Sequence, residues 1–182
     1  LETLINQALH TIDLANVFLG KPESLSGIVE NRSLSDIEVE DFAFGQIIYE
    51  KNRTLSLTAI NSKDESWKPI LKIKGSKGSF ILEGSDSLID LDVNSTDVLN
   101  ELSAIETKMK EDKSLPGKKC YGNLHNLVIS DFSEAVINNR KPYVSIKDAS
   151  IANEIVLGFY YSTSKKDTVS FPIKEYRQPI LR

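Results

Sequence analysis

The sequence predicts an α+β fold: a mostly antiparallel open sheet with helices packed on one face. Three observations predict it: helical spacing of apolar residues at the start, alternating runs rich in β-branched and aromatic residues over about 24–93, and two helical stretches near the end. The spacers between the alternating runs are too short for the crossover connection that parallel neighbours need. The order of helix, meander, two helices and final strand is typical of an α+β layer.

Residues 1–19 have the clearest helical pattern. Apolar residues from Leu4 to Leu19 share one stripe, and Gly20 with Pro22 is a stop signal. A contiguous polar surface is expected on the opposite side of this helix, and it is the first candidate site. That surface consists of Thr3, Asn6, His10 and Asp13.

The alternating runs predict five or six strands. Leu71 and Ile73 alternate with lysines, which indicates one buried and one more polar face. The segment 75–78 lacks the length of a phosphate-binding loop and is not followed by a helix, so it predicts a tight turn. The predicted strands cover residues 25–31, 39–50, 55–61, 70–74, 79–83 and 88–93.

The strand predicted over 39–50 is apolar on both faces. Phe42, Phe44 and Ile48 point one way. The apolar residues that point the other way are Val39, Ala43, Ile47 and Tyr49. Such a pattern indicates either a central strand covered on both faces or a strand whose outer face meets a partner.

The last third of the chain is mainly helical. A helical opening at 96–107 passes into a charged segment, 108–119, which predicts a solvated loop. One helix is predicted over 124–139. A second has an N-cap signature at Ser145 and an apolar stripe that runs from Ala149 to Phe159. An extended segment at 168–171 follows.

Composition limits the function. The chain has 182 residues, 40% hydrophobic and 26% charged, which predicts a single domain over 1–182. A net charge of -4 argues against nucleic-acid binding, and no apolar run approaches the roughly 20 residues of a membrane helix. One cysteine and two histidines cannot form a structural zinc site, so we expect no metal and a reducing, cytoplasmic setting. The chain begins in helical spacing without an initiator Met, as a piece of a longer protein would.

Two histidines are candidates for chemistry. His10 and Asn6 are separated by one helical turn, so both project from the same side of the helix. Such a histidine can act as a general acid or base, because imidazole both accepts and donates a proton near neutral pH. It can equally cap or hydrogen-bond a neighbour, and spacing alone favours that role. His125, near the start of a helix, is by itself more typical of a structural residue.

Five segments, in order along nearly the whole chain, resemble landmarks of the C-terminal domain of the Gfo/Idh/MocA oxidoreductases. The first is the opening helix, 4–14, followed by Phe18-Leu19-Gly20. Val39-Glu40-Asp41 resembles the family's "VED" strand start, and 73–79 resembles its "I-x-G-x-x-G" hairpin. The last two are 131–142, similar to "DF-x-x-A-I…R-x-P", and 161–172, similar to "Y-x-S…V-x-x-P".

The resemblance implies a dihydrodipicolinate-reductase-like fold and the role of a substrate-binding and oligomerisation domain. It implies an N-terminal Rossmann domain, absent from this chain, that binds most of an NAD or NADP cofactor. No cofactor-binding residue is then expected here, and this chain alone should be inactive. In the family an acidic residue and a histidine stand where Asn6 and His10 stand. By that likeness His10 is the catalytic proton acceptor or donor, completed by a lysine of the missing domain, while hydride moves between a sugar carbon and the nicotinamide.

Asn6 departs from the acidic residue of the family pattern. His10 then lacks a neighbouring carboxylate that would fix its tautomer. Asparagine at this position resembles the branch that acts on nucleotide-linked amino sugars, as does Tyr121-Gly122-Asn123 with His125. Asn6, Tyr121 and His125 are therefore the expected substrate-binding residues, for a sugar or nucleotide sugar.

The sequence supports two hypotheses for the function of the whole chain. The first is the substrate domain of an NAD(P)-dependent sugar or nucleotide-sugar dehydrogenase, assembled as a homodimer or homotetramer through the open sheet face. The second is a non-catalytic scaffold or binding domain of the same fold, which Asn6 and the two-sided strand at 39–50 favour.

Overall fold

The computed structural model describes residues 2–32, 39–62, 68–84, 87–111 and 125–174, with side chains throughout except over 106–111. The chain divides into two compact units. The first contains Leu1–Leu71, Leu82–Ser87 and Ile146–Arg182, and the second contains Lys72–Ile81 and Leu88–Ser145.

The first unit is built on a four-stranded sheet. Its strands are β1 (Pro22–Glu30), β2 (Phe42–Tyr49), β3 (Arg53–Ile60) and the short β7 (Val169–Ser170), in the order β3-β2-β1-β7. All three neighbouring pairs are antiparallel, as the short spacers predicted. The α+β class is therefore confirmed.

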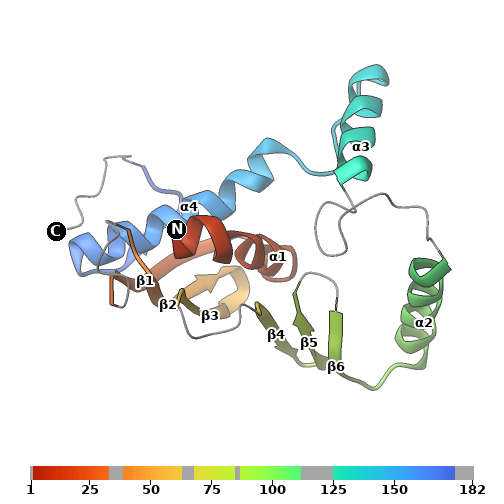
Figure 1. Cartoon of the computed structure of the whole chain (residues 1–182), viewed down its shortest axis with the longest axis horizontal. Helices are drawn as coiled ribbons and strands as arrows, with labels where there is room; N and C mark the ends of the chain where they lie inside the picture. Colours follow the sequence, from red (N-terminus) through yellow and green to blue (C-terminus); the bar gives the residue numbers. More distant parts are fainter. Residues whose placement is uncertain (1, 33–38, 63–67, 85–86, 112–124, 175–182) are drawn as a thin grey trace. The chain divides into compact units, whose positions relative to one another are not determined.

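Two helices cover the inner face of this sheet (Figure 1). These are α1 (Leu9–Leu19) and α4 (Ile146–Lys165), which pack against each other and against the strands. The buried core joins Leu25, Ile47, Ile12, Ile155 and Phe159 from these strands and helices. The predicted two-sided β2 is confirmed, since Ala43, Ile47 and Tyr49 are buried while Phe44, on the outer face, is 52% exposed.

A pair of glycines makes room for the largest core ring. Gly27 on β1 lies directly opposite Gly45 on β2. A β-carbon on either glycine would lie 2.6 Å from the ring of Phe159 on α4. The close approach of α4 to the sheet therefore depends on the absence of side chains at both positions.

The edge of β1 that faces away from β2 is completed mostly by α4. β7 pairs only with Ser24 and Leu25 of β1. Further along, the Gly27 amide donates to Ser162 Oγ over 3.0 Å, and the Val29 amide donates to Thr163 Oγ1 over 2.8 Å. Two helical hydroxyls thus satisfy strand amides that no neighbouring strand reaches.

The remaining strands form a separate three-stranded sheet. Its order is β4-β5-β6, formed by β4 (Ile70–Gly75), β5 (Gly78–Glu83) and β6 (Ser87–Val93). The predicted tight turn is confirmed, because only Ser76 and Lys77 separate β4 from β5. A two-residue connection makes that pair antiparallel. The second unit also carries α2 (Thr96–Glu111) and α3 (His125–Ile137).

Several boundaries differ from the sequence prediction, among them those of the first helix, β2 and α2. The π-helical segment η1 (Leu4–Ala8) precedes α1, so the first helix is not α-helical throughout. β2 begins at Phe42 rather than at residue 39, because Glu40 and Asp41 have turned into the core, where they are 3% and 1% exposed. α2 extends to Glu111, beyond the residue at which the charged loop was expected to start.

The apolar stripe predicted along the helix at 124–139 is largely uncovered in α3. Ala135 is buried, but Phe132 and Val136 are 60% and 66% exposed. Helical periodicity identifies a face that can be buried without identifying what buries it.

Candidate active site

Asn6 and His10 lie on the exposed side of the first helix, as their spacing predicted. Asn6 belongs to η1 and His10 to the first turn of α1, and both side chains are solvent-exposed. The Leu9 amide donates to the Leu4 carbonyl oxygen, the wider hydrogen bond of a π turn. Single π turns inside helices occur frequently at functional sites. The sequence carried no signal for this one.

The buried side of the same helix holds it against the sheet. Leu4, Ile12 and Ala15 are fully buried and belong to the stripe that predicted the helix. At the carboxyl end, Arg53 Nη1 donates to the carbonyl oxygens of Phe18 and Leu19 over 3.3 and 3.2 Å. A cation at this end satisfies orphan carbonyls and complements the helix dipole.

Thr3 does not belong to the polar surface that the helical wheel predicted. Its side chain is 1% exposed, and its hydroxyl donates to the main-chain oxygen of Glu40 over 3.2 Å. The π turn changes the angular spacing of the residues, and Thr3 occupies the cap position before it. The exposed polar surface is therefore limited to Asn6, His10 and Asp13.

Glu40 reaches the amino end of this helix from the segment before β2. Its Oε1 accepts a hydrogen bond from the Leu4 amide over 3.0 Å. Its Oε2 accepts one from the hydroxyl of Tyr160 on α4 over 2.8 Å. Two segments singled out by the family resemblance, at 39–41 and next to 161–172, thus meet beneath the helix, which sequence reasoning did not foresee.

Two tyrosine hydroxyls are held in their protonated form near this helix. Burial, and then the hydrogen bond to Glu40, raise the pKa of Tyr160 well above its usual range. Burial also raises the pKa of Tyr49, whose hydroxyl donates to Asn16 Oδ1 on α1 over 2.7 Å. Both hydroxyls therefore remain protonated donors at neutral pH.

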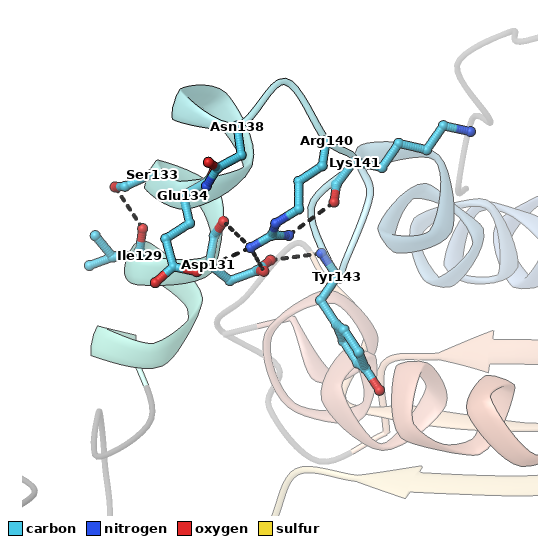
Figure 2. Close-up of polar contacts among 8 residues, drawn as sticks. All are labelled: Ile129, Asp131, Ser133, Glu134, Asn138, Arg140, Lys141 and Tyr143. Carbon is cyan, nitrogen blue, oxygen red and sulfur yellow. Dashed lines mark hydrogen bonds and ion pairs between the residues drawn. The ribbon is translucent and has the colours of Figure 1, made fainter.

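The segment that resembles "DF-x-x-A-I…R-x-P" forms a polar cluster in the second unit (Figure 2). Asp131 Oδ2 accepts from the Tyr143 amide over 2.7 Å, and Asp131 Oδ1 pairs with Arg140 over 2.8 Å. These contacts, the Tyr143 amide first, lower the pKa of Asp131 below its usual value. The hydrogen bond to Asp131 likewise raises the pKa of Arg140. The cluster folds the chain after α3 back onto that helix.

Neither of the other two expected site residues belongs to the described part of the first unit, which carries Asn6 and His10. Tyr121 lies outside the described residues. His125 is the exposed first residue of α3 and belongs to the second unit, whereas Asn6 and His10 belong to the first.

Two general features of the described residues bear on function. Among them, no three side chains of histidine, cysteine, aspartate or glutamate are grouped so that they could hold a metal ion. No helix in the described part of the chain combines the length and apolar character required to cross a membrane.

Comparison with known proteins identifies a family model. The model for "Oxidoreductase family, C-terminal alpha/beta domain" matches residues 3–171. No curated protein sequence matches this chain.

Several solved structures share the fold. WlbA dehydrogenase from Bordetella pertussis, in complex with NADH and UDP-GlcNAcA, superposes with a TM-score of 0.77 at 16% identity, over 95% of this chain and 49% of that one. WlbA from Chromobacterium violaceum, with the same two ligands, superposes with a TM-score of 0.74 at 18% identity, over 96% of this chain and 47% of that one. Levoglucosan dehydrogenase with NADH and levoglucosan superposes with a TM-score of 0.68 at 17% identity, over 94% of this chain and 50% of that one. The chain thus spans about half the length of these structures.

Proposed function

Because the chain belongs to the C-terminal domain family of the Gfo/Idh/MocA oxidoreductases, we propose that it is the substrate-binding and oligomerisation domain of an NAD(P)-dependent dehydrogenase. The full protein would transfer hydride between the nicotinamide and a hydroxyl-bearing carbon of a sugar or nucleotide sugar. The observation that carries the proposal is the exposed pair Asn6 and His10 on one face of a firmly packed helix.

His10 has the chemistry that this reaction needs. When a sugar hydroxyl is oxidised to a carbonyl, the O–H proton must leave as the C–H bond breaks, and an imidazole can accept it. In the reverse direction His10 returns the proton. The amide of Asn6 can both donate to and accept from neighbouring sugar hydroxyls. Tyr121 and His125 are proposed as further substrate contacts.

A nicotinamide cofactor supplies the hydride acceptor or donor when it is bound. The sequence has no G-x-G-x-x-G turn, so this chain offers no cradle for the pyrophosphate. The amide and imidazole of the Asn6/His10 face suit sugar hydroxyls instead. Binding of NAD or NADP is therefore assigned to an N-terminal Rossmann domain outside this chain, and this chain alone is expected to be inactive. The NADH in two WlbA structures and in levoglucosan dehydrogenase supports a nicotinamide cofactor for the full-length protein.

The outer face of the four-stranded sheet is proposed as the contact between copies in a homodimer or homotetramer. Ile28 and Phe44 form a cross-strand pair on this face and are 40% and 52% exposed, and Ile60 is 46% exposed. Apolar side chains grouped on an uncovered sheet face are typical of a protein interface. A cytoplasmic location fits a single cysteine that has no partner within the sequence.

The second candidate function is a non-catalytic scaffold of the same fold. The observation that favours it is Asn6, because an amide beside His10 does not act as the carboxylate of the family pattern would. The two candidates predict different cofactor binding. A dehydrogenase binds NAD(H) or NADP(H) in the full-length protein, whereas a scaffold that has lost its dinucleotide site does not.

The experiment uses the full-length protein. Calorimetric titration with NADH and NADPH should show binding of one or both. A screen of sugars and nucleotide sugars should then show that one of them reduces the oxidised form, NAD⁺ or NADP⁺, of the cofactor that binds. His10→Ala should lower kcat by about 10²–10⁴-fold, because it removes the proton acceptor, and leave the cofactor Kd within about twofold. Val17→Ala, an exposed position on the same helix, is the control and should retain activity. Absence of cofactor binding, or full activity in His10→Ala, would contradict the proposal.

A further inference from the structure

Glu40 is a buried carboxylate far in sequence from the helix that it contacts. It is 3% exposed and precedes β2, while the residues that it binds lie at positions 3, 4 and 160. Burying a carboxylate is unfavourable unless hydrogen bonds or charges replace the lost water. The contacts of Glu40 therefore show what its burial stabilises.

Most of these contacts are to the start of the helix that carries Asn6. The Leu4 amide donates to Oε1 over 3.0 Å, and the Thr3 amide and hydroxyl approach the main-chain oxygen of Glu40 at 3.4 and 3.2 Å. The first amides of a helix have no partner within it, and the positive end of the helix dipole favours a negative group. Thr3, at the cap position, makes no side-chain cap of its own. Glu40 thus serves as a cap supplied by a distant segment.

The remaining carboxylate oxygen ties the cap to α4. Oε2 accepts the Tyr160 hydroxyl over 2.8 Å. Tyr160 itself is packed against the main core, together with Ile5 and Leu9 of the first helix. The position of the π turn is therefore set from two sides, by the segment before β2 and by α4.

We propose that Glu40 and Tyr160 are positioning residues, which hold the π turn of η1 in place and thereby set where Asn6 and His10 stand on the exposed face. The inference rests on the proposed function for the importance of that face. The anchoring itself depends only on the contacts of Glu40. Asn6 lies two residues from the anchored Leu4 amide, and His10 lies on the first turn after η1.

The chemistry of the two partners explains why a carboxylate stands at this position. The Leu4 amide and the Tyr160 hydroxyl are both donors in the structure. A carboxylate accepts from both, whereas the amide of glutamine has one acceptor and must turn its NH₂ group toward one of them. Glu40→Gln therefore conserves shape but removes the negative charge, and its NH₂ group replaces a charged acceptor either at the Leu4 amide or at the Tyr160 hydroxyl.

The chain offers a matched control at the other end of the same helix. Tyr49 is fully buried, and its hydroxyl donates to Asn16 of α1 over 2.7 Å. Tyr49→Phe removes a tyrosine hydroxyl that is bonded directly to this helix, more than a turn beyond His10, whereas Tyr160→Phe removes one that is bonded to the Glu40 cap. If Tyr160 has only a structural role, Tyr160→Phe and Tyr49→Phe should have the same kcat.

The test compares Glu40→Gln, Tyr160→Phe and Tyr49→Phe in the full-length protein by hydrogen exchange and by kinetics. Tyr160→Phe and Glu40→Gln should speed amide exchange over residues 4–10 about tenfold, because a charge-assisted hydrogen bond is lost. Tyr49→Phe should speed exchange only around residues 13–20. The first two variants should also lower kcat about tenfold or more and leave KM for the cofactor unchanged, whereas Tyr49→Phe should retain kcat.

Each outcome bears on a different part of the proposal. Unchanged exchange over residues 4–10 in both Tyr160→Phe and Glu40→Gln would overturn the anchoring. If Tyr160→Phe and Glu40→Gln exchange faster over residues 4–10 but have the same kcat as Tyr49→Phe, then Glu40 and Tyr160 are only structural residues. That result would overturn the positioning role. A full-length protein without any cofactor-dependent activity would contradict the proposed function but not the anchoring. The exchange measurement would still decide whether Glu40 anchors the turn.

Discussion

Asp131 accepts hydrogen bonds on both of its carboxylate oxygens although it lies at the surface. One oxygen receives the Tyr143 amide and the other meets Arg140, so the turn that follows α3 is fixed to the helix. The Tyr143 amide is the larger cause of the lowered pKa of Asp131. This clamp accounts for the aspartate and the arginine of the "DF-x-x-A-I…R-x-P" resemblance.

The clamp should weaken in acid. Because folding lowers the pKa of Asp131 below its ordinary 3.8, the stabilisation is complete above that value and is lost as pH falls through the lower, folded-state pKa. In an NMR titration from about pH 6 to 2, the Tyr143 amide signal should shift with a midpoint below 3.8. Asp131→Asn should abolish the shift, and Asp90→Asn, on β6, should preserve it. A midpoint above 3.8 would contradict the assignment.

At the residue scale, the sequence predicted which side chains are exposed more successfully than which are buried and polar. Periodicity placed Asn6 and His10 on an open face, because apolar and polar positions alternate regularly along that helix. It placed Thr3 there as well, which is wrong, since the π turn is stabilised by Glu40 from 36 residues away. Helical periodicity contains no information about a contact at that separation.

At the scale of elements, the glycine pair on β1 and β2 fixes how closely α4 approaches the sheet. Phe159 is fully buried over Gly27 and Gly45, and a β-carbon on Gly45 would also lie 2.7 Å from the Ser26 carbonyl oxygen. These glycines are needed for close packing rather than for an unusual backbone angle.

Gly45→Ala should lower the free energy of unfolding by about 1–3 kcal/mol, because the added methyl overpacks the core against both ring and backbone. Gly75→Ala is the matched control: its β-carbon would meet only the Gly78 carbonyl oxygen, at 3.9 Å. It should stay within about 1 kcal/mol of the parent protein. Chemical denaturation of the three proteins provides the measurement. Equal losses in the two variants would show that backbone propensity, and not the Phe159 contact, sets the cost.

Most elements could be predicted from the sequence, and the exceptions have physical causes. The strands were found within a few residues because alternation and short spacers are local signals. The start of β2 was misplaced because Glu40 and Asp41 are buried polar residues, which alternation cannot distinguish from strand residues. The division of the strands between two sheets was also not predicted, since pairing across long separations leaves no periodic signal.

At the scale of the whole molecule, the outer sheet face is the proposed surface of self-association. Phe44→Lys should shift the full-length protein toward monomer in sedimentation velocity, because a charge would be buried in an apolar contact. Val17→Lys places the same charge on α1, which covers the opposite face, at a position 76% exposed, and should leave the assembly intact. A monomeric parent protein at high concentration would exclude this surface as an interface.

The hydroxyls of Ser162 and Thr163 also restrict how copies of this domain can meet. A strand edge with free amides invites another chain to add a strand, and this route leads to aggregation. At β1 the Gly27 and Val29 amides are already engaged by α4, so an incoming strand would have to displace a packed helix. Growth of the sheet beyond β1 is thereby disfavoured. The domain can therefore present an apolar sheet face to a partner, while this strand edge does not accept additional strands from other copies.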